Sequence, residues 1–131
     1  MLQPTQLPAV AIEQNFVTAV IGLERAHRYR EAVSGYRTAL VRWPESLSAR
    51  MGLGNSYYAL GELKKSEAVF KETIQLHPEE GSAYNNLAQV LMEQGHYPDA
   101  LAAAQKAVSL GGPLKAVYQE TLTEIESQMS Q

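Results

Sequence analysis

The chain has 131 residues, a formal net charge of −3 and no cysteine. This length allows one compact domain or one short array of repeats, and the absence of cysteine excludes disulfides, thiolate metal sites and a cysteine nucleophile. The negative net charge gives no general attraction to nucleic acid, and no apolar stretch reaches the ~20 residues of a membrane-spanning helix. We therefore expect no nucleic acid partner and no membrane insertion.

The first twelve residues contain Pro4 and Pro8. They lack the basic start and the apolar stretch of a secretory signal. We expect residues 1–12 to be a lead-in or linker, which fits a chain cut from a longer protein, although residues 9–12 could also extend the first helix.

A period of 34 residues organises the chain after this lead-in. Gly61 and Gly95 are 34 residues apart, and so are Pro44 and Pro78. Such a period is the signature of a repeat architecture. It divides the chain into three units, which are residues 13–46, 47–80 and 81–114.

Each unit is predicted to contain two helices. Apolar residues recur at spacings of three and four in two runs per unit, which is the pattern of amphipathic helices. Gly61 and Gly95 lie between the two runs and can end a first helix, while Pro44 and Pro78 follow the second run and stop it. The predicted fold class is an all-α solenoid of stacked helical hairpins.

The recurring residues resemble the tetratricopeptide repeat, whose signature is W-x2-L-G-x2-Y, then A-x3-F, then P. The second unit agrees best, with Arg50 replacing the first aromatic residue, and reads Arg50, Leu53, Gly54, Tyr57, Ser66, Phe70 and Pro78. The first unit reads Phe16, Ala19, Val20, Leu23, Ala32, Tyr36 and Pro44. The third reads Tyr84, Leu87, Ala88, Leu91, Ala100 and Ala104, with Pro113 one place late. The resemblance implies a superhelix of three repeats.

Residues 115–131 are predicted to form a C-terminal capping helix. Apolar residues gather near one of its faces, namely Leu114, Val117, Leu122, Ile125 and Met129. A final amphipathic helix commonly covers the last apolar face of a solenoid. We expect this face to be buried against the third unit.

No catalytic, metal or cofactor motif stands out. His27, His77 and His96 do not have the spacing of zinc ligands. The chain also lacks the glycine-rich phosphate-binding motifs and the serine nucleophile motif. The sequence therefore predicts a protein that is not an enzyme and has no cofactor or metal.

Charge is unevenly distributed along the chain. All six arginines lie between residues 25 and 50, whereas Glu120, Glu124 and Glu126 follow residue 116 without a basic residue. Three interpretations stay open: an acidic partner at the first unit, weak self-association of copies head to tail, and an ordinary solvated face.

The resemblance also implies a binding groove, because the first helices of tetratricopeptide repeats line a concave surface. The places that form it in the family correspond here to Val17, Ile21, Met51, Asn55, Tyr58, Asn85, Asn86, Gln89 and Met92. Amide side chains can pair with the backbone of an extended peptide, and methionine gives adaptable apolar contact.

Some members of the family bind acidic chaperone tails with a carboxylate clamp. Its five places here hold Val17, Ile21, Asn55, Ser82 and Asn86. Only Asn55 agrees with the clamp, so the resemblance does not extend to chaperone tails.

We interpret the chain as a non-catalytic module that binds a protein or peptide partner, as an extended segment or a helix. One alternative is the accessory tail of a larger bacterial enzyme, because GLGNSYYALG, NNLAQVL and LGGPL are similar to tetratricopeptide tails of bacterial papain-like double-glycine peptidase proteins. Another is a self-assembling structural protein. The compartment stays open between the cytoplasm and, for a fragment of an exported protein, the cell envelope.

Overall fold

The structure is a computed structural model that describes residues 9–131. Over this range the chain forms seven α-helices and no strand. The helices are α1 (Ala9–Arg25), α2 (Tyr29–Arg42), α3 (Leu47–Ala59), α4 (Leu63–Leu76), α5 (Gly81–Glu93), α6 (Tyr97–Leu110) and α7 (Lys115–Met129). Residues 9–12, which the sequence assigned to the lead-in, begin α1, and the rest of the predicted lead-in lies outside the described residues.

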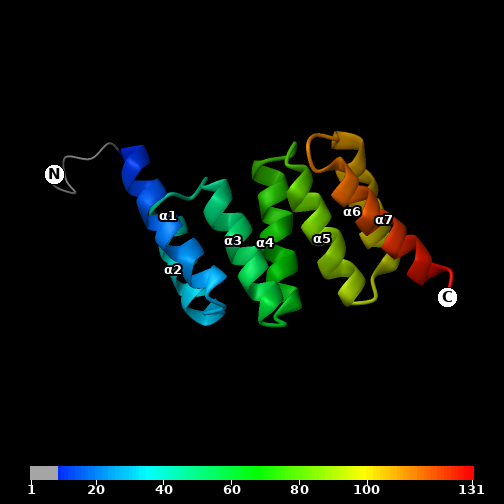
Figure 1. The fold of residues 1–131 in the computed structure, drawn as a ribbon, viewed down its shortest axis with the longest axis horizontal. Helices are drawn as coiled ribbons and strands as arrows, with labels where there is room; N and C mark the ends of the chain where they lie inside the picture. The colour runs from blue at the N-terminus through cyan, green and yellow to red at the C-terminus, as the bar shows by residue number, and fades with distance from the viewer. Residues whose placement is uncertain (1–8) are drawn as a thin grey trace.

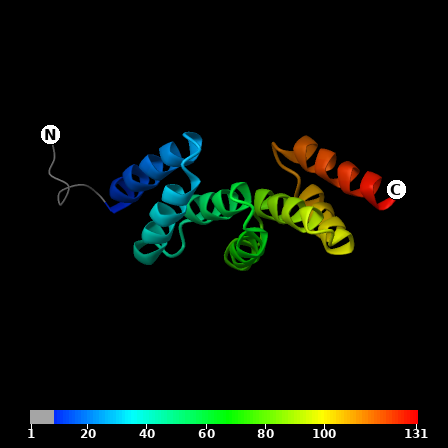
Figure 2. The same cartoon turned by 90° about the horizontal axis from the view of Figure 1, so that it is seen from below.

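The helices stack side by side into a curved slab, with neighbours in sequence packed against each other (Figure 1). Seen from below in Figure 2, α1 and α7 lie at the two ends of the slab on the same side, and α4 lies on the opposite side. The odd-numbered helices form an inner layer, and α1 contacts α3, α3 contacts α5, and α5 contacts α7. The all-α solenoid predicted from the 34-residue period is confirmed.

Left-handed residues end the first helix of each pair. Gly61 and Gly95 have φ angles of 75° and 78°, and His27 takes the same place in the first pair with a φ of 60°. Glycine adopts this conformation without a steric penalty, whereas histidine does so at some cost. The turn is therefore retained at all three places, although only two of them could be recognised from a glycine.

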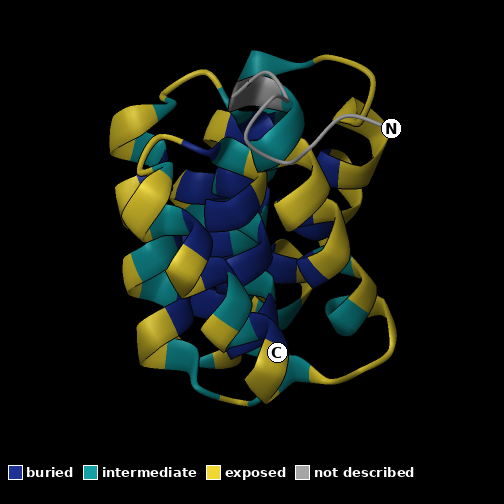
Figure 3. Cartoon of the chain, turned by 90° about the vertical axis from the view of Figure 1, so that its left-hand side faces the viewer, coloured by how far each residue is buried: buried dark blue, intermediate teal, exposed yellow. Residues whose placement is uncertain are grey.

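The core runs between the two layers as a column of buried residues flanked by exposed ones (Figure 3). It contains two clusters of buried residues. The front cluster, around Tyr36, is built from α1, α2 and α3, and the back cluster, around Phe70 and Ile125, is built from α4, α5, α6 and α7. The layers approach closely where a large ring faces a glycine. A Cβ atom added to Gly54 would lie 2.6 Å from Cε1 of Phe70.

Replacing Gly54 by Ala is expected to destabilise the protein by about 1–3 kcal/mol, because the added methyl group overpacks the Phe70 ring. Urea unfolding followed by circular dichroism measures the change. Gly22→Ala is the matched control, since a Cβ at this exposed helical glycine meets no atom within 4 Å. The control should be neutral or slightly stabilising, as alanine favours a helix. Equal stability of the Gly54→Ala variant and the wild type would contradict this packing.

The last helix packs through a face that differs from the predicted one. The buried residues of α7 are Tyr118, Thr121 and Ile125. Of the predicted apolar face, Ile125 is buried in the back cluster and Leu122 is half-buried against it, as predicted. The prediction was wrong for Leu114, Val117 and Met129, which are 48%, 45% and 44% exposed.

The repeat register explains this difference. Tyr118 and Ile125 lie 34 residues after Tyr84 and Leu91, so α7 packs in the register of the first helix of a further repeat. The phenol of Tyr118 lies over Gly81, and its hydroxyl is 3.0 Å from Oγ of Ser82. The apolar stripe of α7 is wider than the surface that α5 and α6 cover, which leaves its edges exposed.

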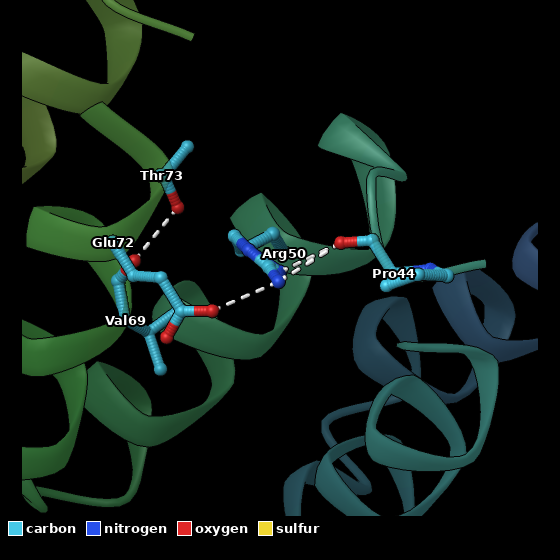
Figure 4. A network of polar contacts seen from close by, with 5 residues as sticks. All are labelled: Pro44, Arg50, Val69, Glu72 and Thr73. Atoms are coloured by element: carbon cyan, nitrogen blue, oxygen red, sulfur yellow. Dashed lines mark hydrogen bonds and ion pairs between the residues drawn. The ribbon is translucent and has the colours of Figure 1, made fainter. Parts of the chain in front are cut away.

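Arg50 occupies the first aromatic place of the repeat signature and joins two repeats (Figure 4). Its Nη1 and Nη2 atoms donate hydrogen bonds of 3.2 and 2.9 Å to the carbonyl oxygen of Pro44. Nη2 also forms an ion pair of 2.9 Å with Oε1 of Glu72, and the Arg50 side chain is only 9% exposed. One repeat later, the hydroxyl of Tyr84 donates to the carbonyl oxygen of Pro78 at 3.1 Å. Arginine and tyrosine thus anchor equivalent proline carbonyls.

Candidate functional site

The concave side of the stack is lined by α1, α3, α5 and α7, and amide side chains lie at its centre. The Nδ2 atom of Asn86 on α5 donates a hydrogen bond of 2.9 Å to Oδ1 of Asn55 on α3. Among the described residues, no further hydrogen bond engages the Asn55 amide NH₂ or the Asn86 carbonyl oxygen. This pair therefore offers both donors and an acceptor toward the groove.

Two of the predicted groove residues belong to its floor. Val17 is 5% exposed and belongs to the front cluster, and Asn85 on α5 is 4% exposed. Val17 also lines a hollow of about 140 Å³, together with Ile21 and Ser48. These two side chains shape the groove more than they present groups to a ligand.

The other predicted groove residues are half-buried, and they contribute apolar edges. Ile21 packs against the front cluster, while Met51, Tyr58 and Met92 pack against the back cluster. Gln89 is half-buried one helical turn after the buried Asn85. The structure thus combines amide and apolar side chains along the inner layer, as the family places indicated.

Tyr58 links the inner helices electrostatically. Its hydroxyl donates a hydrogen bond of 3.0 Å to Oε1 of Glu93. Burial raises the pKa of Tyr58 to about 12, and the nearby carboxylates of Glu93 and Glu124 add to the effect. The hydroxyl therefore remains protonated at neutral pH and can act as a donor.

The concave side extends onto α7, which the sequence reading assigned only to a cap. A shallow hollow of about 680 Å³ is lined by α7 side chains that include Gln119, Glu120, Thr123 and Glu124. Three of these residues follow Asn85, Asn86 and Gln89 by 34 positions, which places them on the groove side of α7. Extending the repeat register one unit further would have identified them from the sequence.

Within residues 9–131, no three side chains of the kinds that bind metals come together. None of the helices in this range is long and apolar enough to span a bilayer.

Comparison with known proteins places this geometry in a family. Residues 18–80 and 54–114 match the tetratricopeptide repeat family. Superkiller protein 3 of Saccharomyces cerevisiae is 29% identical over 94 residues, which cover 70% of this chain. The chain spans only 7% of the length of that relative.

Two solved structures have the same fold. The translocator chaperone SycD of the Yersinia enterocolitica type III secretion system superimposes with a TM-score of 0.86 at 14% identity, covering 97% of this chain and 92% of its own. The first tetratricopeptide domain of Spaghetti (RPAP3), bound to the HSP90 peptide SRMEEVD, gives a TM-score of 0.83 at 13% identity, with coverages of 91% and 94%. At such identities the likeness establishes the fold alone.

The similarity to tails of double-glycine peptidase proteins stays a prediction. The family assignment rests on matched residues that run from 18 to 114 and coincide with the stacked helical pairs. The chain belongs to the tetratricopeptide repeat family.

Proposed function

We propose that this chain is a non-catalytic interaction module that binds an extended peptide segment of another protein along α1, α3, α5 and α7. The observation that carries the proposal is the Asn55–Asn86 pair on the inner layer, since its remaining donors and acceptor suit a peptide backbone. Half-buried apolar side chains beside the pair, such as Met51 and Met92, would contact the side chains of the bound segment.

The family supports this proposal. The Spaghetti domain, which has the same fold, was solved with a bound HSP90 peptide. The partner of this chain is expected to differ from that peptide, because the three basic places of the clamp hold Val17, Ser82 and Asn86, none of which is a cation. We propose three repeats over residues 13–46, 47–80 and 81–114 as the binding unit, with α7 extending the groove.

Combined replacement of Asn55, Asn86 and Gln89 by Ala is expected to weaken peptide binding roughly 10- to 100-fold. Each lost hydrogen bond to the peptide backbone is worth about 0.5–1.5 kcal/mol. The ligand is first selected from a library of random twelve-residue peptides displayed on phage. Its affinities for the wild type and the variant are then measured by isothermal titration calorimetry.

The matched control is Gln75→Ala with Gln105→Ala, since these exposed amides lie on the outer helices α4 and α6. It should bind like the wild type, and all proteins should keep the same helicity. Unchanged affinity of the groove variant would contradict the proposal. In that case, reversing the charges of Arg28, Arg30 and Arg37 would be expected to abolish binding. That outcome would assign binding to the arginine-rich surface of α2.

A further inference from the structure

Three carboxylates lie on the groove side of the C-terminal half of the stack. Glu93 ends α5 and accepts the hydrogen bond of Tyr58, which comes from α3. Glu124 of α7 lies close enough to raise the pKa of the same phenol. Glu120 lies one helical turn before Glu124, and both line the hollow on α7. All three glutamates are exposed, so a ligand can reach them.

The described residues provide these carboxylates with no cationic partner. The ion pairs between residues 11 and 131 join Arg28 to Glu31, Arg50 to Glu72, Lys65 to Glu62 and Lys71 to Glu67. None of them involves a groove carboxylate. The negative charge of this part of the groove is therefore not compensated within the fold.

Basic residues are scarce on the inner helices here. Across α3, α5 and α7 there are only two, Arg50 and Lys115. Arg50 is buried and engaged by Pro44 and Glu72. Lys115 begins α7, and its backbone lies about 7.5 Å along the helix axis from that of Glu120. Lys115 is thus the one exposed basic residue of α3, α5 and α7, against three exposed carboxylates.

The helix ends add to the negative potential. The inner helices run in the same direction, so their C-termini lie along one edge of the slab (Figure 1). Neither α3, α5 nor α7 has a basic residue in its last turn. Each helix C-terminus carries a partial negative charge of roughly half an electron, which favours a cation nearby.

Tyr58 supplies a further feature that suits a cation. Its side chain is half-buried, and its hydroxyl is directed to Glu93. A lysine or arginine over an exposed aromatic face is attracted by the ring quadrupole. Aromatic and carboxylate groups together recognise both the charge and the aliphatic stem of such a side chain.

We propose that the C-terminal half of the groove binds a lysine- or arginine-rich peptide segment, with its cations at Glu93, Glu120 and Glu124. Charge complementarity along the inner layer supports this assignment, which rests on the proposed function of the groove. It assigns to this chain a partner of opposite charge to the SRMEEVD tail bound by the Spaghetti domain.

The test uses the full chain and three fluorescein-labelled ten-residue peptides. They alternate alanine with lysine, glutamine or glutamate. In 50 mM salt, fluorescence anisotropy should show the lysine peptide binding at least tenfold more tightly than the glutamate peptide. Replacing Glu93, Glu120 and Glu124 together by Gln should weaken the lysine peptide about tenfold, since each exposed ion pair contributes a small factor. The preference should shrink in 0.5 M salt.

The matched control removes the same charge elsewhere, by Glu45→Gln, Glu79→Gln and Asp99→Asn. These exposed residues lie in two interhelical loops and in the first turn of α6. The control should change affinity less than twofold. A loss equal to that of the groove variant would overturn the proposal, because general electrostatics would then explain the binding. Absence of any preference for the lysine peptide would overturn it as well.

The remaining outcomes separate this inference from the proposed function. If the glutamine peptide binds as well as the lysine peptide and the Asn55, Asn86 and Gln89 variant loses it, the groove binds peptides but the charge inference fails. If the lysine peptide depends on the glutamates but not on those amides, the charge inference holds and the amide mechanism fails.

Sedimentation at low salt tests a second copy of this chain as the occupant of the groove. A wild-type dimer that the Gln variant abolishes, without any preference for the lysine peptide, would overturn the proposal in favour of that copy.

Discussion

Deletion of residues 114–131 is expected to yield a protein that aggregates or melts at a much lower temperature than the full chain. α7 buries Tyr118 and Ile125, and full burial of one large apolar side chain contributes about 1.5–3 kcal/mol. The deletion also exposes the part of the back cluster that Ile125 covers. The total loss is comparable with the 5–15 kcal/mol net stability of a typical domain. Thermal circular dichroism and light scattering after size exclusion measure both effects.

Two single substitutions locate the stabilising face of α7. Ile125→Ala should cost about 2–5 kcal/mol, because the side chain is fully buried. Val117→Ala should cost much less, as Val117 is 45% exposed. A monomeric deletion protein with an unchanged melting temperature would show that α7 is dispensable. Equal costs of the two substitutions would contradict the packing register.

The helices could be predicted from the sequence because their boundaries have local chemical causes. Gly61 and Gly95 adopt the left-handed conformation that ends a helix, and Pro44 and Pro78 cannot continue one. Such effects act within a few residues and need no knowledge of the fold. His27 shows the limit, because the same left-handed turn forms there without a glycine.

The buried face of α7 depended on tertiary context. Its apolar residues occupy a broad stripe, and helical periodicity alone cannot choose which part of that stripe is buried. The choice is made by the neighbouring surface, where Gly81 leaves room for the ring of Tyr118. The same 34-residue period that defines the repeats contains this information, since Tyr118 follows Tyr84 by one period.

The sequence predicts which residues hold the groove places of the repeat, but not which of their side chains are exposed or hydrogen-bonded to one another. Family places identified Asn55 and Asn86, whereas their mutual hydrogen bond depends on the distance between α3 and α5. Val17 and Asn85 hold groove places, yet neighbouring helices bury them. The sequence shows the uncompensated charge of Glu120 and Glu124, but only the packing of α7 brings these two residues to the groove side near Glu93 of α5.

Replacing Arg50 by Ala is expected to destabilise the protein by about 2–4 kcal/mol. The substitution removes hydrogen bonds from a charged donor to the Pro44 carbonyl and leaves a cavity at a nearly buried position. The ion pair with Glu72 adds little, since the Glu72 side chain is 60% exposed, so Glu72→Gln should cost less than about 1 kcal/mol. Urea unfolding at constant pH gives the free energies of unfolding of the wild type, Arg50→Ala and Glu72→Gln.

Arg50→Tyr distinguishes the hydrogen bond from the charge. Tyr84 already donates to the carbonyl oxygen of Pro78 from the equivalent place, so a tyrosine at position 50 can donate to the carbonyl of Pro44. We expect this variant to recover most of the stability lost in Arg50→Ala. If Arg50→Tyr were as unstable as Arg50→Ala while Glu72→Gln cost several kcal/mol, the ion pair would be the main contribution. If instead the tyrosine variant is stable, the first aromatic place of the repeat serves chiefly to anchor the proline carbonyl between repeats. A buried arginine fills that role in the second repeat because its guanidinium donates to the equivalent carbonyl oxygen.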